Sequence, residues 1–592
     1  MKVHVQFTIP FTIGLAILCI GAGVTAIALK TTAVAHADAP AAATEDTPEY
    51  HEKIVSLLKQ QENVVTNVLP SLHPKRTNFN DEAPIPPQCY TKHEQAFNPC
   101  YVCHQNHVPG RENTMNDGSL QLEYAFSDVG MTNHWQNLFE DRSAAVAAIS
   151  DADIMRWVDT DNYSALAPSL KAEGFRGWIP DLANLHLAAE AFDQQGFALD
   201  GSHWVAFNYK PLPSTFWPTN GSTDDVMIRL DKPFRTNAKG QYVKDIYVAN
   251  LAILEAKVKG LDAISSLPID ETQVGVDLND DGQLATVTHV SRLDHWVGAA
   301  QGRFIDPYLY PQGTEFLHTV RYLDIDNEGR IGPSKRMKEV RYMRKWMDYS
   351  KAVYQREYQL ENYAKDMGQL PRYTLVGDHG IDNGYGWAVQ GFIEGVNGQL
   401  RTLTYEENLF CMGCHSALGA TIDKTFAFPR KVDGQAGWQY INLAGMPDAP
   451  NMGESEGEIS TYLQRVGGGG EFRSNPEMYA KWFVTQGPAK GQVNVDKVNA
   501  AADVYELITP TAERALELNK AYRTIVAEQD FLYGRDATVT PPVNVHRFLD
   551  NDTAATLPAK LFFPWDIRLD WHQLPAADAV TATELPPAPA GR

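Results

Sequence analysis

Two pentapeptides of the same form constrain this chain more than any other feature of its sequence. They are Cys100-Tyr101-Val102-Cys103-His104 and Cys411-Met412-Gly413-Cys414-His415. In the pattern Cys-x-x-Cys-His, two thiols tether a haem covalently and the adjacent histidine ligates its iron. The pattern therefore predicts two haem c groups as cofactors. The cofactor-binding residues would be Cys100, Cys103, Cys411 and Cys414, and the proximal ligands of the haem iron would be His104 and His415.

Two other interpretations of the paired cysteines stay open from the sequence. A structural zinc site needs four such ligands, but the pairs lie about 310 residues apart, and each is followed by a histidine that a zinc ribbon does not need. A thioredoxin-like dithiol needs a strand and a helix around the motif, which neither motif shows clearly. Haem attachment is the favoured interpretation.

The first residues have the order of a secretory signal. A short start with one lysine precedes an uncharged apolar stretch over residues 11–29, and Ala35-His36-Ala37 is a small-x-small cleavage site. The apolar stretch is nearly long enough to span a bilayer, so an uncleaved N-terminal anchor is the alternative. Leu18 precedes Cys19, where lipidation requires a small residue, so no lipid is expected there. We predict export to the periplasm or cell surface of a bacterium, with anchoring in the inner membrane as the alternative.

The charge of the chain bears on its partners. There are 73 acidic and 51 basic residues, which gives a formal net charge of −22. Nucleic acid binding needs a basic surface and is not expected. An acidic surface favours a redox partner protein with a basic docking surface, although it also simply keeps exported proteins soluble. Cys89 lies outside both motifs and the signal, and is expected to be a buried small residue rather than a free thiol.

The hydrophobic patterns predict an α+β fold. Mainly helical haem-binding regions at both ends of the chain would be separated by a mixed α/β middle region. Helices are predicted over residues 246–257, 335–363 and 510–528, and strands over 225–230 and 314–323. The predicted organisation is a signal peptide or anchor over 1–37, a linker over 38–50, a first haem-binding region over 51–200, a middle region over 201–370, a second haem-binding region over 371–575 and a disordered tail over 576–592.

Two weaker patterns concern metals. Met446, in the sequence Ala-Gly-Met-Pro, is the candidate distal ligand of the second haem, with a methionine that fills a core gap as the alternative. Asp277, Asn279 and Asp281 precede Gly282 in the first half of an EF-hand-type calcium loop. Thr288 stands where the closing glutamate would be, so a polar turn between strands is the alternative to calcium.

The two Cys-x-x-Cys-His motifs resemble those of di-haem c-type cytochromes. The resemblance implies an exported cytochrome that transfers electrons through covalently bound haem. A di-haem peroxidase-like or oxygenase-like oxidoreductase with one open iron position is the second hypothesis, and no catalytic residue is assigned. The motifs lie further apart here than in the di-haem cytochrome c peroxidases and rubber oxygenases, and no characterised family is recognised over the whole chain.

Overall fold

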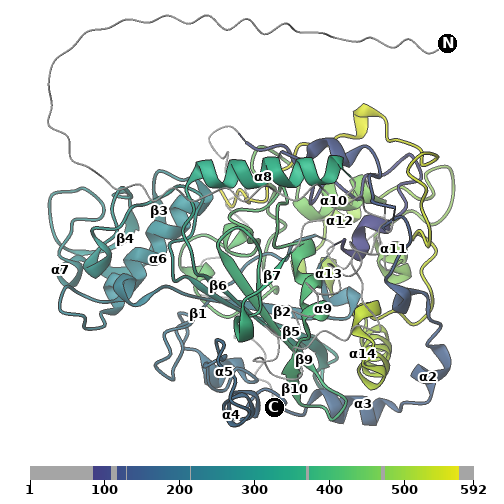
Figure 1. The fold of residues 1–592 in the computed structure, drawn as a ribbon, viewed down its shortest axis with the longest axis horizontal. Helices are drawn as coiled ribbons and strands as arrows, with labels where there is room; N and C mark the ends of the chain where they lie inside the picture. Colours follow the sequence, from purple (N-terminus) through teal and green to yellow (C-terminus); the bar gives the residue numbers. More distant parts are fainter. Residues whose placement is uncertain are drawn as a thin grey trace, which may run out of the picture. The chain divides into compact units, whose positions relative to one another are not determined.

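An antiparallel sheet assembled from distant parts of the chain organises the fold (Figure 1). The structure is a computed structural model that describes residues 85–108, 116–128, 130–213, 215–367, 373–467 and 474–572. By its contacts the chain divides into two units, Met1–Glu62 and Asn63–Arg592, and all described residues belong to the second.

The sheet has eight strands in the described part of the chain. Their order is β1-β2-β5-β6-β9-β8-β7, with β10 paired to β9. A separate hairpin consists of β3 (Ile264–Asp270) and β4 (Thr286–Val290). The strands of the main sheet are β1 (Val205–Ala206), β2 (Thr223–Arg229), β5 (Glu315–Ile325), β6 (Ile331–Lys345), β7 (Thr374–Leu375), β8 (Ile381–Asp382), β9 (Trp387–Glu394) and β10 (Leu400–Thr402).

The helices are mostly short and lie around this sheet (Figure 1). The three longest begin with residues 244, 351 and 512. The α-helices of the described residues are α2 (Ser143–Ala147), α3 (Asp151–Val158), α4 (Leu166–Ala172), α5 (Ala188–Ala191), α6 (Lys244–Lys259), α7 (Glu271–Val274), α8 (Lys351–Asp366), α9 (Tyr405–Leu409), α10 (Glu458–Val466), α11 (Pro476–Trp482), α12 (Val495–Asn499), α13 (Val504–Ile508) and α14 (Ala512–Glu528).

The two faces of the sheet have different neighbours, because side chains alternate along a strand. Met227, Leu317, Val340 and Tyr342 lie on one face and share an apolar cluster with residues of α4 and the segment after it. The opposite face carries Val226, Phe316, Met343 and Val389, which belong to the main core together with Cys411. The second face is the wall on which the candidate site is built.

The predicted fold class is wrong in its arrangement. The ends of the chain are not mainly helical regions: between residues 85 and 200 the described helices have eight residues or fewer, and loops connect them. The sheet crosses the predicted boundary, since β7 to β10 come from the supposed second helical region and pair with the strands of the middle. The fold is a mixed α/β fold with one large antiparallel sheet. No observation tests the predicted region boundaries, which stay predictions.

The individual elements were predicted with mixed success. The helices over 246–257 and 510–528 correspond to α6 and α14, and the strands over 225–230 and 314–323 correspond to β2 and β5. The predicted helix over 335–363 is wrong in its first half, which forms strand β6, and only α8 is helical. α14 begins where the pattern indicates, because the Thr511 side chain accepts a hydrogen bond from the Arg514 amide as an N-cap.

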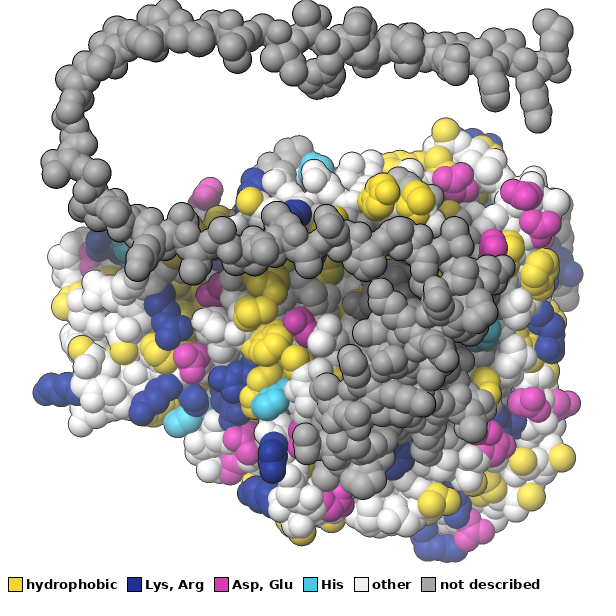
Figure 2. Space-filling model, viewed as in Figure 1, with side chains coloured by type: hydrophobic (Ala, Val, Ile, Leu, Met, Phe, Trp, Pro, Cys, Tyr) yellow, Lys and Arg dark blue, Asp and Glu magenta, His cyan; other side chains and the backbone are white. Residues whose placement is uncertain are grey.

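Charged residues occur both on the surface and inside the unit. On the face drawn in Figure 2, acidic and basic side chains lie intermixed among polar ones. Inside, Arg321, Arg430, Lys345 and Glu394 are at most 2 % exposed. Each forms ion pairs or hydrogen bonds with buried partners, as buried charges require.

Candidate functional site

Both Cys-x-x-Cys-His motifs adopt the same tight turn. In the first, the amides of Cys103 and His104 donate to the Cys100 carbonyl at 3.2 and 3.0 Å. In the second, the amides of Cys414 and His415 donate to the Cys411 carbonyl at the same two distances. The two motifs therefore share the same backbone turn.

The second motif is held by the helix that precedes it. α9 begins with a capping box in which Thr404 and Glu407 each bond the other's backbone. The helix continues into a 3₁₀ turn, Phe410–Gly413, which contains Cys411. Arg401 forms two hydrogen bonds of 2.8 Å with the Glu407 carboxylate, so the start of α9 is fixed to β10.

The two motifs meet in the folded chain. The Ala420 amide, just after the second motif, donates to the Cys103 carbonyl at 3.1 Å. Gly419 lies against residues that follow the first motif. A Cβ atom on Gly419 would stand 2.1 Å from the Gln105 carbonyl oxygen and 2.3 Å from an Asp117 carboxylate oxygen. This close contact joins segments that are about 310 residues apart in sequence.

A cavity lies between the sheet and the segments that carry the motifs. It encloses about 1900 Å³ of space, the part open to solvent included. Its first wall is the sheet, with Asp224 and Val226 on β2, Phe316, His318 and Val320 on β5, and Glu339, Arg341 and Met343 on β6. Its second wall is the cover formed by the motifs and the segments after them, with Cys103, Cys411, Cys414, His415, Phe426 and Phe428.

The thiols in the cavity are protonated at neutral pH. Burial raises the pKa of Cys414 to about 11, and burial with the nearby Cys414 raises the pKa of Cys103 well above its ordinary value. The pKa of Cys411 is raised by burial as well. None of the five described cysteines forms a disulfide. Because thiol–disulfide exchange needs an accessible thiolate, these groups do not fit the dithiol alternative.

His415 is held as a neutral imidazole with one nitrogen engaged. Its Nδ1 lies 2.8 Å from the Lys424 carbonyl oxygen, which can only accept, so Nδ1 carries the proton and donates. Burial lowers the pKa of His415 to about 4. The unprotonated Nε2 therefore keeps its lone pair. Asn383 donates to the His415 carbonyl oxygen at 2.7 Å and holds the same residue from the backbone side.

A buried lysine supports the turn that holds His415. Lys424 is fully buried, its ammonium group donates to the Tyr358 hydroxyl, and it lies 4.4 Å from the ring centroids of Tyr358 and Tyr385. Burial lowers the pKa of Lys424 from 10.5 to about 7. The Lys424 residue whose carbonyl orients His415 therefore buries an amine that is costly to keep charged.

The lowered pKa of Lys424 predicts a pH dependence of stability. Between pH 7 and 10.5 the unfolded chain binds the proton that the folded chain has lost, so the free energy of unfolding rises with pH in that window. From pH 7 to 9 we expect wild type to gain about 2 kcal/mol relative to Lys424→Met. Urea unfolding of both proteins at the two pH values measures the difference, and equal pH profiles would contradict the assignment.

The remaining predicted site residues do not line the cavity. Cys100 and His104 are not among the residues that line it, and the His104 Nδ1 pairs with Asp117 at 2.9 Å. Met446 does not line it either; it is 3 % exposed and packs in the main apolar core. Asp277 accepts from the amides of Asp281 and Gly282 within its own loop, as in a polar turn.

Three cavity residues were missed by sequence reasoning. His318, Arg341 and Asp224 are polar groups on strands, on the face that also carries Glu339 and several apolar residues of the cavity wall. Burial raises the pKa of Asp224 to about 7. Burial, Arg341 and His415 together lower the pKa of His318 well below its ordinary value. Arg341 was missed because residues 335–345 were predicted to be helical, whereas no local sequence pattern marks Asp224 or His318 as cavity residues.

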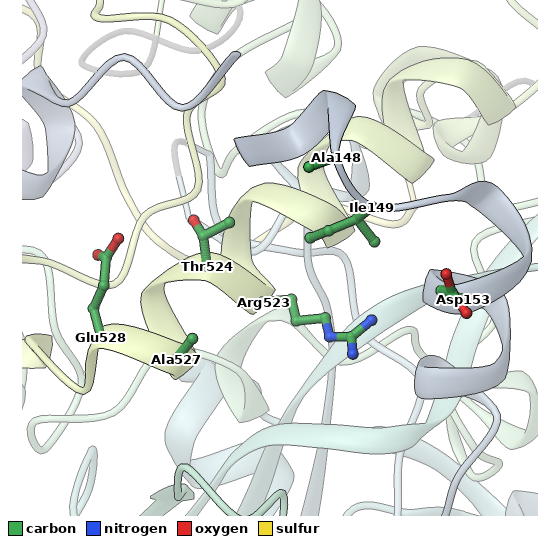
Figure 3. Close-up of a pocket in the computed structure, with 7 residues that line it drawn as sticks. All are labelled: Ala148, Ile149, Asp153, Arg523, Thr524, Ala527 and Glu528. Carbon is green, nitrogen blue, oxygen red and sulfur yellow. The ribbon is translucent and has the colours of Figure 1, made fainter. Parts of the chain in front are cut away.

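A second depression lies on the surface between α14 and the segment from α2 to α3 (Figure 3). Arg523 extends from α14 toward the helix that carries Asp153, and Thr524 and Glu528 lie further along α14 (Figure 3). Its lining residues include no cysteine or histidine. The motif-lined cavity is therefore the better candidate site.

Comparison with known proteins identifies a class of lipoproteins. A family model whose description reads ":-like lipoprotein" matches residues 74–504, which is more than half of the chain. The chain is also 32 % identical over 517 residues to an uncharacterized lipoprotein of Aquifex aeolicus (strain VF5), covering 78 % of this chain and 86 % of that protein. This chain belongs to that lipoprotein family. No solved structure matches it.

These findings correct the predicted identity and function. The family found is a lipoprotein family rather than the di-haem c-type cytochromes, so that assignment is wrong, and with it the predicted roles in electron transfer and in peroxidase-like or oxygenase-like chemistry. The predicted cofactors, two haem c and calcium, are corrected too. Among the described residues no group of three or more His, Cys, Asp or Glu side chains could hold a metal ion.

The predicted export is confirmed in its general form, because the family is one of exported, membrane-associated lipoproteins. Within the described ranges no helix is both long and apolar enough to cross a membrane. The predicted signal or anchor, Cys19, the linker and the tail beyond residue 575 lie outside the described residues.

Proposed function

We propose that this chain is an exported binding protein whose internal cavity holds one largely apolar, anionic ligand against the motif thiols and His415. The observation that carries the proposal is that residues of both motifs line one cavity. Cys103 of the first motif lines the same cavity as Cys411, Cys414 and His415 of the second. A fold that only needed small apolar residues at these positions would not require two identical turns to meet there.

The walls of the cavity support a ligand of this class. Most of the lining is apolar, as in small-molecule sites, with a few polar groups that can orient a ligand. The apolar lining includes Val102, Leu212, Phe216, Val226, Phe316, Met343, Val389, Phe410, Phe426 and Phe428. A ligand that enters such a space gains affinity from the apolar surface that it buries.

Arg341 is the group that favours a negative charge on the ligand. Its Nε donates to Glu339 at 2.9 Å, while its terminal nitrogens form no hydrogen bond with other described residues. Glu339 is already shared with Arg535, which lies 3.2 Å from the same carboxylate oxygen. The guanidinium of Arg341 thus has donors left for a carboxylate or similar anion, for which a guanidinium is well suited.

The mass of the purified protein tests the proposal. We expect a ligand mass in addition to the mature chain under native conditions, and a comparison with denaturing conditions shows whether the thiols hold it covalently. Cys411→Ser and Cys414→Ser should lower the fraction of loaded chains several-fold. Cys89→Ser is the matched control, since Cys89 is not among the lining residues. A chain that carries no ligand, and does not bind an apolar anionic dye, would contradict the proposal.

For the membrane association we propose attachment in the inner membrane through the apolar stretch over residues 11–29. Leu18 before Cys19 does not suit lipid transfer to that cysteine. The N-terminal peptide of the mature protein distinguishes the outcomes, since it starts at Met1 for an anchor, near Asp38 after cleavage, and at a modified Cys19 for a lipid. The expectation of a partner protein with a basic docking surface stays a prediction.

A further inference from the structure

One imidazole in the sheet wall, that of His318, has a ring nitrogen without a hydrogen-bond partner among the described residues. The Nε2 atom of His318 is buried and forms no hydrogen bond among the described residues. The Asp224 Oδ2 atom lies 3.7 Å from the His318 Nε2 atom, which is too long for a hydrogen bond. The Asp224 Oδ2 already accepts a hydrogen bond from the Tyr209 hydroxyl. A buried polar atom without a partner costs free energy, so its retention needs an explanation.

The position of His318 in the sheet relates it to the rest of the cavity. On β5 it stands between its cross-strand neighbours Val226 on β2 and Arg341 on β6. The ring of Phe216 contacts it edge-on at 5.0 Å between centroids and also lies 5.1 Å below the Arg341 guanidinium. The imidazole is thus fixed beside Arg341, a cation of the cavity wall whose terminal nitrogens have unused donors among the described residues.

His318 and His415 belong to different walls. His318 is on the sheet, whereas His415 follows α9 in the cover, and both line the same cavity. The two imidazoles are close enough that a proton on His415 would lower the pKa of His318. Each has an Nε2 atom that is not used within the described structure.

From this arrangement we infer that His318 is a ligand-binding residue that contacts the ligand from the sheet wall, opposite the thiols and His415. The inference rests on the proposed function and narrows the ligand class. Besides the anionic group beside Arg341, the ligand carries a polar atom within its apolar body that exchanges a hydrogen bond with His318. The neutral imidazole can take either role in that bond.

The test compares His318 variants with 1-anilinonaphthalene-8-sulfonate, an apolar anion, as the probe. On protein that native mass spectrometry shows to be empty, His318→Ala should raise the dissociation constant of the probe about fivefold, the usual effect of one hydrogen bond. His318→Gln keeps a polar side chain and should raise it twofold or less. His295→Ala is the control, because its side chain is 67 % exposed, and should leave binding unchanged. On chains purified with their own ligand, His318→Ala should at least halve the loaded fraction.

Arg341→Gln separates the two possible failures. If it weakens probe binding while His318→Ala leaves both readouts at wild-type values, the cavity binds its ligand without His318 and the inference is wrong. If neither variant has an effect, the probe binds elsewhere and the proposed function fails together with the inference.

Discussion

Arg430→Met should lower the free energy of unfolding by about 3–5 kcal/mol, the cost of removing one partner from a buried ion pair. Arg430 is fully buried, and its guanidinium holds both oxygens of the Glu458 carboxylate. It also donates to the carbonyls of Lys210, Pro211 and Ile567 at 2.9–3.1 Å. The substitution leaves Glu458 charged, buried and without its main partner.

Urea unfolding of wild type and variant measures this effect. Arg156→Met is the matched control, because Arg156 is 71 % exposed in its pair with Asp153, and its removal should change stability by less than about 0.5 kcal/mol. The double variant Arg430→Met, Glu458→Met should be more stable than Arg430→Met, since it no longer buries a carboxylate that has lost its main partner. A loss below about 1 kcal/mol in the single variant would show that Lys210, 3.3 Å from Glu458, compensates alone.

Strand β6 shows why the sequence predicted only part of the fold. The pattern predicts α6 and α14 correctly, because each has apolar residues at helical spacing or a clear cap. In β6 the alternate positions are filled by charged residues on both faces, so apolar and polar residues do not alternate. Arg336 pairs with Glu394 of β9, Arg341 with Glu339, and Lys345 with Asp423. These partners are distant in sequence or on the same strand, and no local pattern indicates that the charges are buried.

The sequence singles out thiols that line the cavity, but it does not indicate the shape of the cavity. The two motifs identify Cys103, Cys411, Cys414 and His415 as a set with shared chemistry, and all four line one cavity. The sequence cannot indicate that Cys100 and His104 are left out of that lining, since this depends on how the motifs pack. His318 and Arg341 become neighbours only through the pairing of β5 with β6. The ten motif residues could not identify the family, because short motifs do not define a whole chain.

Gly419→Ala should separate the two motifs and lower the free energy of unfolding by about 2–3 kcal/mol, as overpacking of a closed contact does. The added methyl group would stand 2.1 Å from the Gln105 carbonyl oxygen and 2.3 Å from Asp117, and both are held in place. Asp117 bonds His104 at 2.9 Å and the Gln105 amide at 3.0 Å. The Gln105 carbonyl also accepts from the Asp117 amide at 3.3 Å, so moving either atom strains the bonds that link Gln105, Asp117 and His104.

The sharpest measurement is hydrogen exchange at the Ala420 amide, which donates to the Cys103 carbonyl across the contact. We expect exchange in the peptide around Ala420 to accelerate at least tenfold in Gly419→Ala, and the fraction of ligand-loaded chains to fall with it. Gly302→Ala is the matched control: Gly302 has no neighbouring atom within 4 Å and no backbone conformation that excludes alanine, so stability and exchange should stay at wild-type values. If Gly419→Ala exchanges like wild type, the motifs do not depend on this contact. The cavity would then have to be held together by the sheet and α9 alone.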